Sequence, residues 1–295
     1  MLNKPSEKER KKIINRIKEK YEFVELGMVG SSVLNRDINF LKIGNSDKMI
    51  LWLGAFHGME WLTTLVLFKF FDEICFYIQG GENSYGINFK KVFEKKSLVI
   101  VPCVNPDGVE IALNGSVSAG EYKHAVNLIS GGKTDYWQAN VRGVDLNHNY
   151  NAKWEELHEL EIKSGITGAS ITRYGGKIYE SEPETKSVVN FCKSNNVEYA
   201  IAFHSQGEEI YYGFDGKIPK NSEKIANLFS IASNYKLSKP EGLAVGGGFK
   251  DWFVSEFNKP AFTVEIGLGK NPLPISDFEK VYEKIKKMLL IAALI

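Results

Sequence analysis

Apolar runs along this chain alternate with stretches in which apolar residues recur at helical spacing. Stretches rich in apolar residues predict strands at 38–43, 48–55, 97–103, 198–204 and 261–266. The run at 97–103 is continuous, which is typical of a strand that is covered on both faces. Helical spacing predicts helices at 60–79, 183–194, 222–235, 250–257 and from 276 onward. Strands that alternate with helices favour one α/β domain over residues 1–295, with a mostly parallel mixed β-sheet flanked by helices on both faces.

Two stretches depart from this alternation. Near the amino terminus, Ser6 and Glu9 have the spacing of a capping box, which predicts a charged helix on the surface within residues 1–21. Between residues 109 and 177 the pattern is poor and Gly, Asn and Ser are frequent, so we expect long loops that carry function. A turn is expected just before them, at Asn105-Pro106-Asp107-Gly108.

Composition and charge narrow the class of protein. A hydrophobic content of 43% and a charged content of 25% are those of a globular protein with a large core. A formal net charge of +1 gives no reason to expect nucleic acid as a partner. The final apolar stretch, 288–295, is too short to span a membrane, so a docked terminal helix is expected there.

The compartment is predicted from the first residues and from the cysteines. The first 20 residues are rich in Lys and Glu and have no apolar core of a secretion signal. The three cysteines are an odd number without ligand-like spacing, which favours reduced core thiols. We therefore expect a cytoplasmic protein that binds neither nucleic acid nor a membrane.

Candidate metal ligands follow two of the predicted strands. His57 and Glu60 come directly after the strand at 48–55, and His204 ends the strand at 198–204. The carboxyl ends of the strands are where open α/β sheets place their sites. Imidazole nitrogens and a carboxylate are ligands that catalytic Zn²⁺ takes readily, with a fourth position left open. These residues therefore predict one zinc ion held by His57, Glu60 and His204.

A fourth polar residue, Glu265, stands inside the otherwise apolar strand at 261–266. A buried charge costs several kcal/mol unless it is paired, and a structural salt bridge is the alternative interpretation. Beside a metal, a carboxylate can take a proton from the water that attacks a carbonyl carbon. We expect Glu265 to be this general base.

In their order along the chain, these motifs resemble the zinc carboxypeptidase family. The shared features are His-x-x-Glu after a strand, Asn-Pro-Asp-Gly, a Gly-Val-Asp-x-Asn loop, a histidine that ends a later strand and a glutamate in a late strand. The resemblance implies that Asp145 holds the first zinc histidine from behind, which fixes the tautomer of its ring. It also implies that Asn147 contacts a carboxylate of the substrate.

The chain departs from the family pattern where the family contacts substrate. His148 replaces the arginine that follows the asparagine, which weakens recognition of a free C-terminal carboxylate. Gln138 replaces the arginine that polarises the scissile carbonyl, and Arg142 could supply that charge instead. Lys250 lies where the family tunes specificity, and a cation there suits a substrate with extra carboxylates. A solvated lysine at a helix start is the alternative for Lys250.

Within the family, the segments at 204–211 and 271–274 resemble the γ-D-glutamyl-L-diamino acid endopeptidases. Those enzymes cut the bond between γ-D-glutamate and a diamino acid, often meso-diaminopimelate, in peptidoglycan stem peptides. The resemblance implies a muropeptide substrate here. The alternatives are a conventional metallocarboxypeptidase that removes C-terminal residues and a zinc-dependent deacylase of small N-acyl amino acids. A catalytically dead binding protein is disfavoured because the ligands and Glu265 are all retained.

Overall fold

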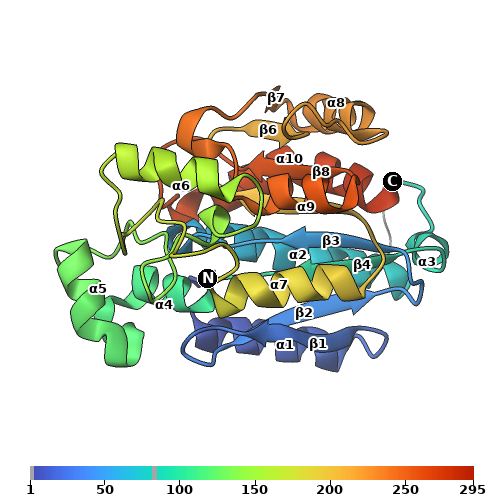
Figure 1. The fold of residues 1–295 in the computed structure, drawn as a ribbon. Helices are drawn as coiled ribbons and strands as arrows, with labels where there is room; N and C mark the ends of the chain where they lie inside the picture. Colours follow the sequence, from blue (N-terminus) through green and yellow to red (C-terminus); the bar gives the residue numbers. More distant parts are fainter. Residues whose placement is uncertain (1–2, 82–84) are drawn as a thin grey trace.

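A twisted sheet forms the centre of the computed structural model, which describes residues 3–81 and 85–295 (Figure 1). Within these residues the sheet has eight strands in the order β1-β2-β4-β3-β5-β8-β6-β7. The strands are β1 (Glu25–Ser31), β2 (Asp37–Ile43), β3 (Met49–Leu53), β4 (Ser97–Val101), β5 (Val197–His204), β6 (Glu209–Tyr212), β7 (Lys236–Leu237) and β8 (Ala261–Glu265).

The sheet is mixed, with a parallel centre. Strands β4, β3, β5 and β8 pair in parallel. Outside them, β2 pairs antiparallel with β1 and with β4, and β6 pairs antiparallel with β8. The parallel centre brings the carboxyl ends of β3, β5 and β8 side by side at one end of the sheet.

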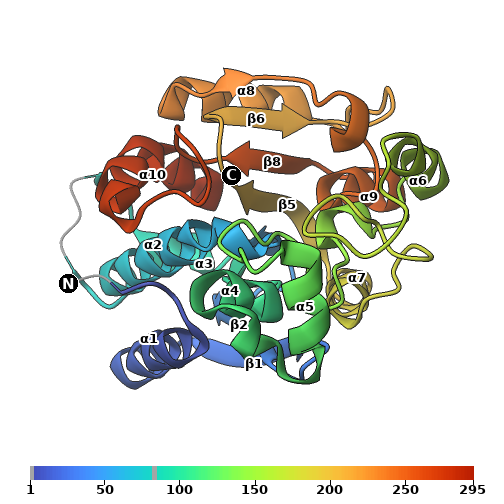
Figure 2. The same cartoon turned by 90° about the vertical axis from the view of Figure 1, so that its left-hand side faces the viewer.

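Helices cover both faces of the sheet, as predicted (Figure 2). Neighbouring side chains of β3 show the two faces, because Trp52 packs into one buried apolar cluster and Leu51 into another. The first cluster includes side chains from α1 (Glu7–Lys20), α2 (Leu62–Ile78), α8 (Ser222–Ser233) and α10 (Phe278–Leu294). The second includes side chains from α7 (Pro183–Ser194) and α9 (Phe249–Phe257).

The expectation of long loops between residues 109 and 177 is wrong in part. That region contains most of α4 (Pro106–Asn114), all of α5 (Lys123–Ser130) and all of α6 (Trp154–Lys163). The expected turn at 105–108 is instead the start of α4. The Asn105 side chain accepts a hydrogen bond from the Gly108 N–H, and Pro106 occupies the first turn, where its missing N–H costs nothing.

Other sequence expectations hold with smaller changes. The amino-terminal helix is α1, capped by Ser6, but its Ile14 and Ile17 are buried, so only part of it is surface. The terminal helix α10 is docked in the core, as expected. All three cysteines are free and buried. Strands β1, β6 and β7 and the short helix α3 (Phe89–Phe93) were not predicted. Among the described residues, no helix has both the length and the apolarity that a membrane crossing needs.

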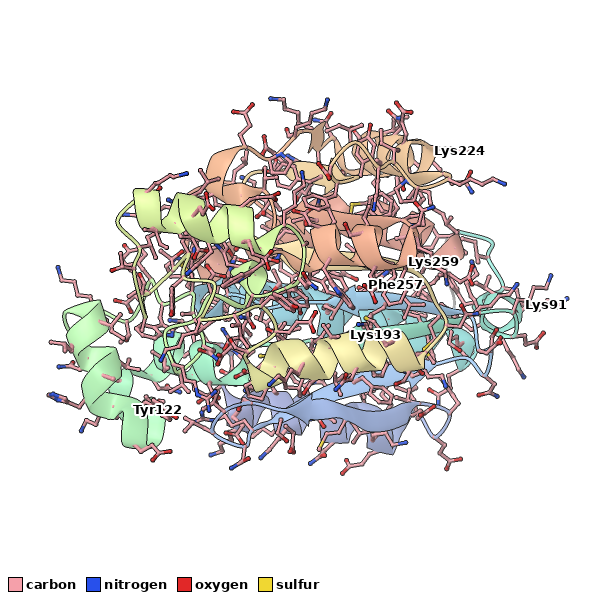
Figure 3. The ribbon with its side chains drawn as sticks, viewed as in Figure 1. Lys91, Tyr122, Lys193, Lys224, Phe257 and Lys259 are labelled. Atoms are coloured by element: carbon pink, nitrogen blue, oxygen red, sulfur yellow. The ribbon has the colours of Figure 1, made fainter. Side chains whose placement is uncertain are left out.

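The two ends of the sheet differ in what surrounds them. Helices α5 and α6 and the long connections between residues 109 and 182 gather at the carboxyl ends of the central strands (Figures 1 and 2). Tyr122 marks this end in Figure 3, whereas Lys193 and Lys259 lie toward the other end. The long connections therefore surround the end of the sheet at which β3, β5 and β8 finish.

Candidate metal centre

Two neighbouring strands, β3 and β5, deliver the predicted metal ligands to one point. His57 follows β3 after a short loop, and the 3₁₀ turn η1 (Gly58–Glu60) returns Glu60 to the same place. His204 is the last residue of β5, which lies between β3 and β8 in the sheet. Ligand atoms of these three residues all lie within 4.8 Å of one another. The structure thus brings together the residues that the sequence predicts as ligands.

The arrangement of the donor atoms fits a zinc ion. His57 Nδ1 lies 2.9 Å from Oε1 of Glu60, and His204 Nδ1 lies 3.0 Å from Oε2 of Glu60. The two Nδ1 atoms are 3.3 Å apart. Two nitrogens bound tetrahedrally to zinc at about 2.0–2.1 Å are separated by about 3.3–3.4 Å. A single ion between these atoms would satisfy all three side chains.

The electrostatics of this cluster also favour a cation. Burial would raise the pKa of Glu60, but the charges of His57 and His204 and their hydrogen bonds outweigh burial and lower the pKa to about 2. The Glu60 carboxylate is therefore ionised at neutral pH. Its side chain is only 4% exposed, so a bound cation would offset the cost of this buried charge.

Asp145 lies behind the first histidine, where the resemblance places it. Its Oδ1 accepts hydrogen bonds from His57 Nε2 at 3.1 Å and from the N–H of Asn147 at 3.1 Å. Its Oδ2 accepts from the N–H of Arg173 at 2.8 Å. Burial opposes the charged form, but neighbouring His57 and His148 and these donors hold the pKa of Asp145 well below its usual range. A fixed carboxylate here directs His57 Nδ1 toward the metal position.

The loop that carries His57 is anchored by backbone contacts. Asn105 Nδ2 donates to the carbonyls of Phe56 and Ala139, both at 3.0 Å. The N–H of Gly58 donates to the carbonyl of Gln138 at 3.0 Å. The connection before His57 and the segment around Gln138 are therefore joined, which fixes the first ligand relative to one wall of the site.

Glu265 is the last residue of β8, and it pairs in register with His204 of β5 and with Glu209 of β6. Its side chain is partly exposed and lines the cavity at the metal cluster. Burial and the nearby charge of Glu60 raise the pKa of Glu265 well above its usual value, although His57 opposes this shift. A carboxylate with raised proton affinity thus faces the same cavity as both histidines.

The cavity has a volume of about 390 Å³ and lies against the metal cluster. Four predicted substrate-contacting residues line it: Gln138, Asn147, His148 and Lys250. Arg142 does not line it, because its guanidinium points to Glu182, with Nη1 and Oε2 3.5 Å apart. The structure therefore does not bring Arg142 to the reacting centre.

Each of those lining residues is held by a neighbour. Gln138 Oε1 accepts a hydrogen bond from the Thr172 hydroxyl, and Asn147 Oδ1 accepts from the N–H of Phe249 at 3.1 Å. His148 Nδ1 lies 2.8 Å from the fully buried Glu161. These contacts fix the orientation of the three side chains at the cavity wall.

Lys250 lines the cavity, and its charge is already paired. It is 6% exposed, so it is not a solvated lysine. Its ammonium donates to the carbonyl of Gly213 at 2.7 Å and forms an ion pair with Asp251. Because Asp251 already balances its charge, Lys250 is not a free cation for a substrate carboxylate.

Three further residues at the site were missed from the sequence. Arg173 and Tyr211 line the cavity, and Glu161 supports His148 from behind. Glu161 also accepts from His158 Nδ1 at 3.0 Å and from the N–H of Gly175 at 3.1 Å. Recognition of 154–163 as a helix would have placed Glu161 four residues after buried Leu157, on the inward face.

Comparisons with known proteins agree with this geometry. The family model described as zinc carboxypeptidase matches residues 11–287. The chain is 33% identical over 274 residues to Gamma-D-glutamyl-L-diamino acid endopeptidase 1 of Lysinibacillus sphaericus, a match that covers 92% of this chain and 67% of the relative. It is 34% identical over 287 residues to the Bacillus subtilis protein YqgT, with 96% and 74% covered.

Among solved structures, bovine thrombin-activatable fibrinolysis inhibitor in complex with tick carboxypeptidase inhibitor has the same fold. The TM-score is 0.74 at 23% sequence identity, with 99% of this chain and 96% of that chain covered.

Proposed function

Because the chain belongs to the zinc carboxypeptidase family and is a zinc metallopeptidase with the ligand set His57, Glu60 and His204, we propose that it cleaves γ-D-glutamyl-diamino acid bonds. The substrates would be peptides derived from peptidoglycan, with meso-diaminopimelate as one such diamino acid. The observation that carries this proposal is the 33% identity, over 92% of the chain, to a relative whose name gives that activity.

The residues at the cavity wall support this substrate over an ordinary C-terminal peptide. A fixed guanidinium is the side chain best suited to bidentate binding of a terminal carboxylate. The chain has His148 where the family resemblance expects that arginine, and Glu161 holds its ring. The site therefore lacks one family feature for binding a terminal carboxylate, and a stem peptide offers further carboxylates that other groups can bind.

The chemistry proceeds through residues already in place. When bound, Zn²⁺ supplies a Lewis acid that polarises a carbonyl and lowers the pKa of water to about 7. Glu265 takes the proton from the attacking water and delivers it to the leaving amine. Asp145 keeps the ring of His57 in the tautomer that ligation needs.

Gln138 is the group that we assign to the scissile carbonyl oxygen. Its Oε1 accepts from Thr172, which leaves the Nε2 amide free to donate. The family pattern has a charged arginine here, and Arg142 lies outside the cavity. A neutral amide donor then stabilises the developing oxyanion, a role that amide side chains fill in other hydrolases.

The test is the identification of products from a defined stem peptide. Zinc-loaded protein is incubated with L-alanyl-γ-D-glutamyl-meso-diaminopimelate, and mass spectrometry follows the reaction. We expect release of free diaminopimelate and L-alanyl-D-glutamate, and loss of turnover when a chelator removes the metal. Turnover of N-acetyl-aspartate in place of the peptide would support a deacylase instead. The absence of any turnover with zinc fully bound would support a binding protein.

A further inference from the structure

One cation in the cavity has no counter-ion. Lys250 is balanced by Asp251, as described above. The guanidinium of Arg173 also lines the cavity, and within the described part of the chain it makes no ion pair or side-chain hydrogen bond. Arg173 thus presents an exposed positive charge to the space beside the metal ligands.

The backbone of Arg173 is fixed in an unusual conformation. Its φ angle is +64°, in the left-handed region that side chains other than glycine rarely adopt. Its N–H donates to Oδ2 of Asp145 at 2.8 Å, and the carbonyl of the next residue, Tyr174, accepts from the N–H of Asp145 at 2.7 Å. Non-glycine residues in such conformations cluster at ligand-binding sites, where the surrounding structure holds them.

The Asp145 carboxylate positions both the backbone of Arg173 and the first zinc ligand, His57. Oδ1 of Asp145 holds His57 Nε2, while Oδ2 holds the backbone of Arg173. The guanidinium is therefore carried on a segment whose position is fixed relative to the first zinc ligand. A group bound by Arg173 would lie at a set place with respect to the bond being cut.

We propose that Arg173 binds a carboxylate of the substrate next to the scissile bond and so determines specificity. This inference rests on the proposed function and deepens it. A peptide with γ-linked D-glutamate keeps the free α-carboxylate of that residue, and meso-diaminopimelate adds a carboxylate at each end. Guanidinium matches carboxylate geometry with two parallel hydrogen bonds. The three carboxylates are the possible sources of the bound group.

Four peptides separate these sources. The reference is L-alanyl-γ-D-glutamyl-meso-diaminopimelate, and each of the other three lacks one carboxylate. One has D-isoglutamine for D-glutamate, one has L-lysine for diaminopimelate, and one has a C-terminal amide. The kcat/KM of each peptide is measured with the unsubstituted enzyme, with Arg173→Met and with the control Lys177→Met. Lys177 is an exposed cation in the same loop as Arg173, and it does not line the cavity.

We expect Arg173→Met to lower kcat/KM for the reference peptide about 10- to 100-fold, the size of a lost hydrogen bond to a charged group. The loss should be absent for the one peptide that already lacks the bound carboxylate. Lys177→Met should match the unsubstituted enzyme. Zinc content should be unchanged, and equilibrium binding of the reference peptide to Glu265→Gln should weaken by the same factor when Arg173→Met is added.

An equal loss on all four peptides, or no loss, would overturn the role of Arg173. Failure of the proposed function would look different, because the unsubstituted enzyme itself would then fail to cleave the reference peptide.

Discussion

At the residue scale, Glu265 is the side chain on which the chemistry depends. It ends β8 beside His204, lines the cavity and does not belong to the cluster of metal ligands. We predict that Glu265→Gln keeps its zinc and loses at least about 10²-fold in kcat, the lower limit of what a general base contributes. The measurements are zinc stoichiometry and steady-state kinetics on the stem peptide.

The matched control for this variant is Glu223→Gln, the same change at an exposed position of α8. It should leave kcat unchanged. A Glu265→Gln enzyme that keeps its zinc and full activity would show that another group takes the proton.

Asp145 gives the second prediction at this scale. It holds both His57 and Arg173, so its replacement should weaken zinc binding. Replacement of such a partner of a zinc histidine typically costs 10- to 100-fold in metal affinity. We predict a fall of about that size for Asp145→Asn, measured by competition with a chromophoric chelator, and no change for Asp135→Asn on the exposed surface. Equal zinc affinity in both variants would contradict the role of Asp145.

The four central residues of the site were predictable because each stands out locally. His57, His204 and Glu265 are polar groups at the ends of apolar strands, and Glu60 opens the helical pattern that follows. Arg173 and Glu161 offered no such contrast, because neither interrupts or ends an apolar run: Arg173 lies among polar residues, and charged and apolar residues alternate around Glu161. Only tertiary contacts, with Asp145 and with His148, bring these two residues to the site. For the same reason the sequence could not show that Arg142 lies against Glu182.

At the element scale, long buried strands and helices were predictable and short polar helices were not. Strands β3, β4 and β8 are almost fully buried, so their sequences are continuous apolar runs. Helices α5 and α6 are only 8 and 10 residues long and each bury three side chains or fewer, so the helical pattern has few turns in which to show. The Asn-Pro-Asp-Gly sequence is ambiguous in principle, because the residues that favour a turn also favour the start of a helix.

A close approach between two of these elements gives the third prediction. Gly58 begins η1, and a Cβ atom there would meet the backbone carbonyl of Gly108 in α4 and would lie 2.8 Å from that of Trp137. Neither obstacle can rotate away, because both are backbone atoms. We predict that Gly58→Ala lowers the free energy of unfolding by about 1–3 kcal/mol, as overpacking does, and weakens zinc binding by displacing His57 and Glu60.

Urea unfolding and zinc titration measure these two effects. Gly168→Ala is the matched control, because a Cβ atom at residue 168 meets nothing within 4 Å. A Gly58→Ala protein with unchanged stability and zinc affinity would show that the approach of η1 to α4 does not position the ligands.

At the scale of the whole molecule, a buried acid links stability to pH. Burial raises the pKa of Glu184 in α7 to about 8, and the charges of Asp107 and Glu182 add to this, although the backbone N–H of Val33 opposes it. Between about pH 5 and pH 8 the folded protein therefore holds a proton that the unfolded chain has released. Stability from this group is present at low pH and falls as pH rises, by at most about 1.4 kcal/mol per pH unit.

Glu184→Gln should remove that part of the pH dependence, because the amide does not titrate in this pH range. Urea unfolding between pH 5 and pH 8.5 should give a flatter curve for the variant, with the largest gain over the unsubstituted protein at the alkaline end. Two parallel curves would show that Glu184 does not take up a proton on folding.

The overall function is tested most directly by the choice between two isomeric peptides. L-alanyl-D-glutamyl-meso-diaminopimelate can be made with the diamino acid on the γ-carboxyl or on the α-carboxyl of D-glutamate, so the two peptides have the same atoms and net charge. The measurement is the ratio of kcat/KM for the two isomers with zinc-loaded enzyme. We predict a ratio of at least about 10² in favour of the γ-linked peptide, equivalent to about 2.7 kcal/mol of transition-state discrimination. A ratio near one, or faster cleavage of the α-linked isomer, would contradict the proposed function and indicate a conventional metallocarboxypeptidase.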